Sequence, residues 1–140
     1  MTTDPHNLQR FVDAQAPIYN RVLAELRSGQ KQSHWMWFIF PQIQGLGRSP
    51  TAQTFAISSR QEAEAYAVHP ILGARLRECT QLVNAVENRT VSQIFGFPDD
   101  LKFHSCMTLF AQAASDRQAF LDALTKFFAG KPDQQTLNRL

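Results

Sequence analysis

Prolines, glycines and helix-capping residues divide this sequence into segments in which apolar side chains recur every three or four residues. That spacing predicts amphipathic helices, each with one apolar face turned to a core. The clearest segment follows Pro17, which suits the first turn of a helix, and ends at Gly29. No two alternating apolar runs are joined by an Asn-Gly or Asp-Gly turn, so the pattern gives no sign of a sheet. The sequence therefore predicts an all-α fold.

The same punctuation predicts further helices along the chain. A short opening helix is indicated around Phe11. The residues placed to begin later helices are Ser59, Pro70, Thr90, Pro98, Ser115 and Asp133. Ser59 and Ser115 are each followed three residues later by Glu or Gln, which is the spacing of a capping box. We expect the helix after Pro70 to be the longest, and residues 1–140 to form one compact all-α domain of about six to eight helices.

Composition limits the classes of function. The chain has 140 residues, 44% of them apolar, which suits one domain with a substantial core. A formal net charge of +2 does not favour a nucleic-acid binder, because such domains usually carry a concentrated basic stripe. Cys79 and Cys106 lack a C-x-x-C spacing and no secretory leader is evident, so we expect a cytoplasmic protein. The longest apolar stretch, Trp35 to Phe40, is far shorter than a membrane span, for which roughly 20 residues are needed.

The run from His34 to Ser49, HWMWFIFPQIQGLGRS, places bulky side chains directly before a glycine turn. Trp35 and Trp37 can stack on a flat ring, and neighbouring cations strengthen such stacking. The alternative is that the run fills the core. Although its residues have strong β propensity, a strand here has no visible partner, so a helical or irregular segment between the early helices is expected.

The stretch Gly45-Leu-Gly47-Arg48-Ser49-Pro50 has the chemistry of an anion seat. Glycines at 45 and 47 allow backbone amides to converge, Arg48 supplies charge, and Ser49 can cap a helix that starts at Pro50. It is not a dinucleotide fingerprint, because no buried strand with a β-α-β continuation surrounds it. The alternative is a simple connection between two helices.

This loop lies in a part of the sequence without acidic residues. No Asp or Glu occurs between Glu25 and Glu62, whereas Lys31 and Arg48 fall in that window. Lys31 and His34 would share one face if that segment were helical, which makes His34 a candidate general base beside a cation. A hydrogen-bonded structural histidine is the alternative.

A second group of polar residues lies farther along the chain. Lys102, Ser105 and Thr108 recur at three-residue spacing and would form a ridge on one helical face. Asp100 precedes them and is a second acid/base candidate, although acids at a helix start also complement the helix dipole. Arg75 can supply another anion contact if its face turns toward the glycine loop. The four dispersed histidines and the two cysteines do not have metal-ligand spacing, so no metal or cofactor is expected.

Four ordered motifs together resemble the bacterial domain-of-unknown-function family 1810, over about residues 11–137. The motif positions are Lys31, His34, Trp35, Trp37, Gln42, Ser49, His69, Arg75, Asp100, Lys102, Ser105 and Thr108. The resemblance implies a compact, mostly helical domain and no established activity. Members sometimes carry the label calpastatin, but calpastatins resemble disordered polar repeats, whereas this chain is rich in aromatic residues.

Two functions remain open. The first is a pocket for a small anionic, nucleotide-like or phosphorylated ligand, formed by the aromatic run, the glycine loop and the cations; if a reaction follows, His34 and then Asp100 are the acid/base candidates. The second is a non-enzymatic protein-interaction module in which the motif residues are structural. The sequence does not specify whether any reaction is catalysed.

Overall fold

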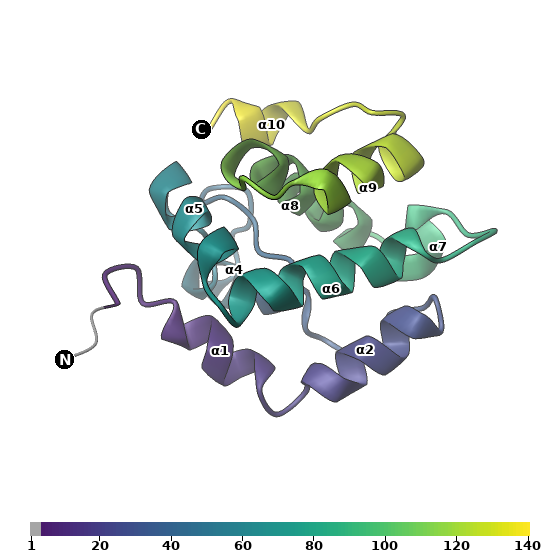
Figure 1. Cartoon of the computed structure of the whole chain (residues 1–140), viewed down its shortest axis with the longest axis horizontal. Coiled ribbons are helices and arrows are strands. Elements are labelled where there is room, and N and C mark those ends of the chain that lie inside the picture. Colours follow the sequence, from purple (N-terminus) through teal and green to yellow (C-terminus); the bar gives the residue numbers. More distant parts are fainter. Residues whose placement is uncertain (1–3) are drawn as a thin grey trace.

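The structure of the protein is a computed structural model that describes residues 4–140; residues 1–3, which the domain prediction of 1–140 includes, lie outside the described part. It is all-α, as predicted (Figure 1). The helices are α1 Gln9–Gln15, α2 Tyr19–Arg27, α3 Met36–Ile39, α4 Pro50–Thr54, α5 Arg60–Val68, α6 Leu72–Asn84, α7 Val91–Phe95, α8 Asp99–Ala113, α9 Gln118–Phe128 and α10 Gln134–Leu137. The expected six to eight helices are too few: the described residues form ten, because several are single turns that carry little periodicity. Within residues 4–140, no helix combines the length and apolar character that crossing a membrane requires.

Three of the predicted helix starts, at Ser49, Ser59 and Thr90, are confirmed by their side-chain caps. The hydroxyl of Ser59 accepts a hydrogen bond from the amide of Glu62, and that of Ser49 accepts one from Ala52. Thr90 and Gln93 form a reciprocal capping box at α7. These side chains satisfy amide groups that a helix leaves unpaired at its first turn.

Two further predictions about helices are wrong. The capping box at Ser115 does not form, and α9 begins at Gln118 after Arg117, which makes no side-chain capping bond. The helix after Pro70 is not the longest: α6 has 13 residues and α8 has 15. α6 starts only at Leu72, where the ring nitrogen Nδ1 of His69 accepts hydrogen bonds from the first two amides of that turn.

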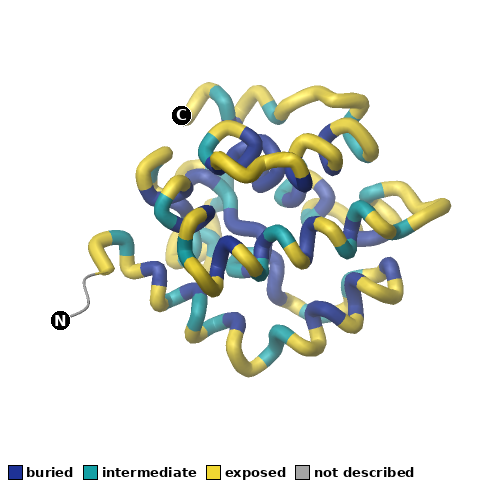
Figure 2. Tube along the Cα trace, in the orientation of Figure 1, coloured by how far each residue is buried: buried dark blue, intermediate teal, exposed yellow. Residues whose placement is uncertain are grey.

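The core is one cluster of apolar side chains around α8, which packs against α5 and α9. α6 lies between α2 and α9 (Figure 1). Figure 2 shows buried residues concentrated in the middle of the molecule and exposed residues around it. Phe103 of α8 is fully buried, with ring centroids 4.7 Å from Phe95 and 5.1 Å from Phe40. Cys79 and Cys106 are free and buried, and a cytoplasmic location stays a prediction.

The aromatic run forms a single helical turn, α3, followed by an extended segment, so the helical or irregular expectation is confirmed. Trp35, Met36, Ile39 and Phe40 are buried, whereas Trp37 is partly exposed. The run therefore contributes to the core on one side and leaves one large ring available on the other.

The glycine loop and α4 form one segment whose two ends, at Ile43 and Ile57, are joined to each other. Ile43 and Ile57 make an isolated parallel bridge, in which the Gln44 amide donates to the Ile57 carbonyl and the Ile57 amide donates to the Gln42 carbonyl, both at 2.8 Å. Both isoleucines are buried. The bridge fixes the position of the loop relative to the aromatic run.

Candidate functional site

Two of the motif segments meet in a groove between the glycine loop, α8 and α10. The groove has a volume of about 400 Å³. It is lined by Gln42, Leu46, Gly47, Pro98, Leu101, Lys102, His104, Ser105, Asp133 and Gln135. A much smaller cavity of about 10 Å³, room for about one water molecule, adjoins it and shares Gln42, Gly47 and Lys102 with it. Trp37 lines this second cavity, so the aromatic run and the polar ridge of α8 converge.

Lys102 belongs to a compact arrangement of charges and rings. The Asp99 carboxylate lies 2.8 Å from the Lys31 ammonium and 3.6 Å from the Lys102 ammonium. Each lysine also lies over a tryptophan: Lys31 is 5.2 Å from the centre of a Trp35 ring, and Lys102 is 5.2 Å from that of Trp37. Cation–π contacts of this kind are attractive because the face of the ring is electron-rich. Two ammonium groups thus share one carboxylate, which leaves a local excess of positive charge.

Burial distinguishes the two lysines. The side chain of Lys31 is 8% exposed and that of Lys102 is 21% exposed. The shorter ion pair is also the more buried one. Lys31 therefore makes the shorter ion pair with Asp99, whereas the Lys102–Asp99 ion pair is longer and the Lys102 side chain lines the groove.

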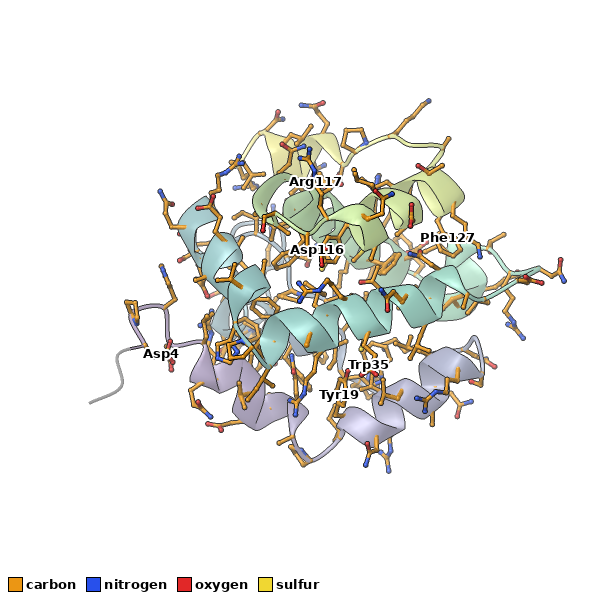
Figure 3. The ribbon with its side chains drawn as sticks, viewed as in Figure 1. Asp4, Tyr19, Trp35, Asp116, Arg117 and Phe127 are labelled. Atoms are coloured by element: carbon orange, nitrogen blue, oxygen red, sulfur yellow. The ribbon has the colours of Figure 1, made fainter. Side chains whose placement is uncertain are left out.

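The segment before α3 is held by a buried carboxylate. Glu25 of α2 accepts hydrogen bonds from the amides of Gln32 and Ser33, from the Ser33 hydroxyl and from the indole nitrogen of Trp35. Figure 3 shows Trp35 close to α2. Burial raises the pKa of Glu25, but these hydrogen bonds outweigh it, so the pKa is lower than the ordinary value. The carboxylate fixes the loop that presents Lys31 and the tryptophans.

The glycine loop borders a further cavity of about 500 Å³, lined by Gln44, Gly45, Gly47, Arg48, Gln53 and Ala56. Gly45 has φ +99°, a conformation that L side chains rarely adopt. A Cβ on Gly47 would come within 2.6 Å of the Ala52 side chain, so close packing against α4 explains that glycine. Gly47 also lines the other two cavities and connects all three.

Comparisons with known proteins give one family. The profile of a family described as "Protein of unknown function (DUF1810)" matches residues 5–140. The chain belongs to the DUF1810 family. This confirms the resemblance drawn from the motifs. The DUF1810 chain is also similar to a solved structure of the conserved hypothetical protein Rv1873 from Mycobacterium tuberculosis, with a TM-score of 0.96 and 54% identity over 98% of both chains. A search of curated proteins gives no match.

In this DUF1810 domain the groove and its adjoining cavities bring together half of the predicted site residues. Those that line a cavity are Trp37, Gln42, Gly45, Gly47, Arg48, Lys102 and Ser105. Lys31 and Trp35 line none of these cavities. Lys31 pairs with Asp99, which also contacts Lys102, and the Trp35 indole donates a hydrogen bond to Glu25. Ser49 is exposed and caps α4 as predicted, and it does not line these cavities.

Other predicted residues of the DUF1810 motifs have structural contacts. Asp100 accepts hydrogen bonds from the Ser92 hydroxyl at 2.7 Å and from the Leu101 amide, which ties α7 to the start of α8. Thr108 is fully buried, donates to the His104 carbonyl and accepts from the Asp133 amide. These bonds connect α8 with the start of α10.

Two predicted residues lie away from the groove. His34 is exposed and lines none of the three cavities. The segment around it is irregular, so Lys31 and His34 do not share a helical face. Arg75 does not turn toward the glycine loop: its guanidinium lies over the Tyr19 ring at 4.7 Å and donates to Gln15. Tyr19, labelled in Figure 3, belongs to α2, on the face that meets α6.

Three residues that shape the site were not predicted from the sequence. Asp99 is one of them, although its spacing of three residues from Lys102 is that of a helical ion pair. Glu25 is another: in the sequence it is notable only as the acidic residue before the stretch that lacks Asp and Glu. Asp133 lines the groove and accepts hydrogen bonds from the hydroxyls of Ser105 and Thr136. Residues 4–140 contain no cluster of three or more His, Cys, Asp or Glu side chains suited to a metal ion.

Proposed function

We propose that this domain binds a small ligand, with a planar ring and an acidic group, in the groove beside Lys102. The observation that carries the proposal is the position of Lys102, which lines two adjoining cavities and lies over the exposed side of the aromatic run at Trp37. The acidic group of the ligand pairs with the Lys102 ammonium in the groove, and its ring reaches Trp37 once Lys102 moves off that ring, because the cavity that Trp37 lines holds only about 10 Å³. Gln42 and Ser105 offer hydrogen-bonding groups on the same walls.

The charge arrangement supports an anion on the Trp37 side of Lys102. Asp99 retains Lys31 at 2.8 Å, so Lys102 can exchange its looser contact for a ligand without leaving that carboxylate unpaired. Asp133 places a negative charge at the other wall, where two hydroxyls already bind it. An acidic group is therefore favoured near Trp37 and disfavoured near Asp133.

We propose binding alone, without a reaction. His34 lies outside the three cavities, and both carboxylate oxygens of Asp100 accept hydrogen bonds from neighbouring groups. Neither residue is placed to touch a ligand in the groove, so a reaction forms no part of the proposal.

The test is a thermal-shift and calorimetric panel at low salt, with nucleotides, NAD, ADP-ribose, sugar phosphates and simple anions. A ligand at about 100 times its dissociation constant stabilises the fold by about 2.7 kcal/mol. We expect at least one ring-bearing anion to shift the melting temperature, and Lys102→Met to abolish the shift. Arg21→Met is the matched control, because it removes the same charge from an exposed position of α2. Equal responses of the two variants would contradict the proposal.

A protein-interaction module is the second candidate. Phe97 is 81% exposed and Leu101 is 54% exposed, and Leu101 lines the groove. Exposed apolar side chains beside a groove are typical of contact surfaces. This alternative predicts no response across the ligand panel. It also predicts that a photoreactive amino acid at position 97 cross-links to one defined protein, and that Leu101→Ser abolishes this cross-link.

A further inference from the structure

The glycine loop has a second cation beside it, supplied by the other end of the chain. The guanidinium of Arg139 lies against Gly45: a Cβ built on this glycine would be 2.3 Å from Nη1 and 2.8 Å from Cζ. The positive φ of residue 45 favours glycine, and the absence of a side chain there leaves the space in which the Arg139 guanidinium lies. Arg139 follows α10, so this contact brings the segment after α10 onto the loop.

Arg48 of the glycine loop and Arg139 beside it have no side-chain partner within the described residues 4–140. Among residues 4–140, neither the Arg48 nor the Arg139 guanidinium forms an ion pair or a hydrogen bond. By contrast, Arg10 pairs with Glu62 at 2.8 Å and donates to several carbonyls. The donors of Arg48 and Arg139 are therefore available to another molecule.

The surroundings of the loop also favour an anion. The adjacent cavity of about 500 Å³ is lined by the amide side chains of Gln44 and Gln53 and by Arg48, with no carboxylate among its lining residues. It shares Gly47 with the groove that contains Lys102. A molecule that binds at Lys102 can thus extend past Gly47 to Arg48, and Arg139 lies beside Gly45 of the same loop.

We propose that Arg48 and Arg139 form a phosphate-binding subsite on the glycine loop. A guanidinium presents paired N–H donors that match two phosphate oxygens, and two guanidinium groups suit a phosphomonoester or a diphosphate better than a carboxylate. This inference rests on the proposed function and narrows it: the ligand is a small molecule with a ring at Trp37 and a phosphate at the loop.

The test uses inorganic pyrophosphate, which has no ring, as the probe. Isothermal titration at low salt compares the full chain with Arg48→Gln, Arg139→Gln and the control Arg21→Gln. We expect each loop variant to weaken pyrophosphate binding by about tenfold, near the lower end of what one charged hydrogen bond contributes. Arg21→Gln should bind within about twofold of the wild type. All three positions carry exposed side chains, and thermal melting verifies that the variants remain folded.

Three outcomes would overturn the subsite. The first is the absence of pyrophosphate binding at millimolar concentration, and the second is an equal loss in the loop variants and Arg21→Gln. The third is a single-stranded oligonucleotide that binds more tightly than pyrophosphate and depends on both loop arginines, which would assign them to a nucleic-acid backbone instead. If the loop variants bind pyrophosphate like the wild type while Lys102→Met still abolishes binding of a ring-bearing anion, only this inference fails and the proposed function stands.

Discussion

Replacing Glu25 tests how the segment that presents Lys31 and the tryptophans is held. One carboxylate oxygen accepts three N–H groups, from Gln32 at 2.6 Å, Ser33 at 2.9 Å and the Trp35 indole at 3.0 Å. The other oxygen accepts the Ser33 hydroxyl. No cation pairs with this carboxylate in the part of the chain that the structure describes.

The two substitutions Glu25→Ala and Glu25→Gln separate the hydrogen bonds from the charge. In the alanine variant the Trp35 N–H, on a side chain that is 1% exposed, loses its acceptor, which costs about 2 kcal/mol. The two backbone amides can turn to water and cost about 1 kcal/mol each, so we expect a loss of about 4 kcal/mol. In the glutamine variant the amide oxygen keeps the three N–H groups and the Ser33 hydroxyl can rotate to accept. Because charge-assisted bonds are roughly twice as strong as neutral ones, the expected loss is about 2 kcal/mol.

The same carboxylate makes stability depend on pH. Since the pKa of Glu25 is lower in the folded than in the unfolded protein, the unfolded state takes up the proton first as the pH falls. The stabilisation is fully present above the unfolded-state pKa of about 4.3 and declines as the pH falls through the folded-state value. Glu25→Gln should therefore flatten the acid limb of the stability curve.

Urea denaturation between about pH 3 and pH 7 measures both effects. Glu87→Gln and Glu87→Ala are the controls, because Glu87 is exposed, and each should change the free energy of unfolding by less than about 0.5 kcal/mol. A loss below about 1 kcal/mol for Glu25→Ala, or an acid limb unchanged in Glu25→Gln, would refute the reasoning.

Further predictions concern the ion pair, a helix cap and the thiols. Asp99→Asn leaves the buried Lys31 ammonium without a counter-charge and should lower the free energy of unfolding by about 2 kcal/mol, measured in urea, whereas no change would show that water replaces the pair. Thr90→Ala removes the capping box of α7 and should cost about 1 kcal/mol in the same assay, with Thr90→Ser close to the wild type. Burial raises the pKa of the Cys79 thiol to about 12 and that of Cys106 well above its ordinary value, so a thiol reagent at neutral pH should label neither until urea unfolds the chain. Rapid labelling of the native protein would contradict that burial.

The sequence predicted those features of the fold that depend on neighbouring residues. Thr90 and Ser59 cap their helices because the side chain and the amide that it accepts from are only three residues apart. Ser115 has the same spacing, yet α9 begins only at Gln118, and the neighbouring Asp116 pairs with Arg77 of α6, which is far away in the sequence. The local pattern contains no information about that partner.

The same limit applies to the candidate site: the spacing of residues predicts which side chains share a helical face, but not what that face contacts. Periodicity placed Lys102 and Ser105 on one face of α8, and that face does line the groove. It could not specify which neighbour the face of Arg75 meets, and the guanidinium packs on Tyr19 instead. Arg139 lies near the end of the chain, outside the span of motifs, and only the three-dimensional arrangement shows that it reaches Gly45.

The bridge between Ile43 and Ile57 has a consequence for how members of the family can diverge. The bridge holds the two ends of the intervening stretch side by side, and most of that stretch is at the surface, so a change in its length adds little chain entropy and does not displace the buried isoleucines. The exposed positions of this stretch other than Gly45 and the capping Ser49 can therefore change between family members without disturbing the helical core, whereas Phe55, which packs on Phe11, belongs to that core.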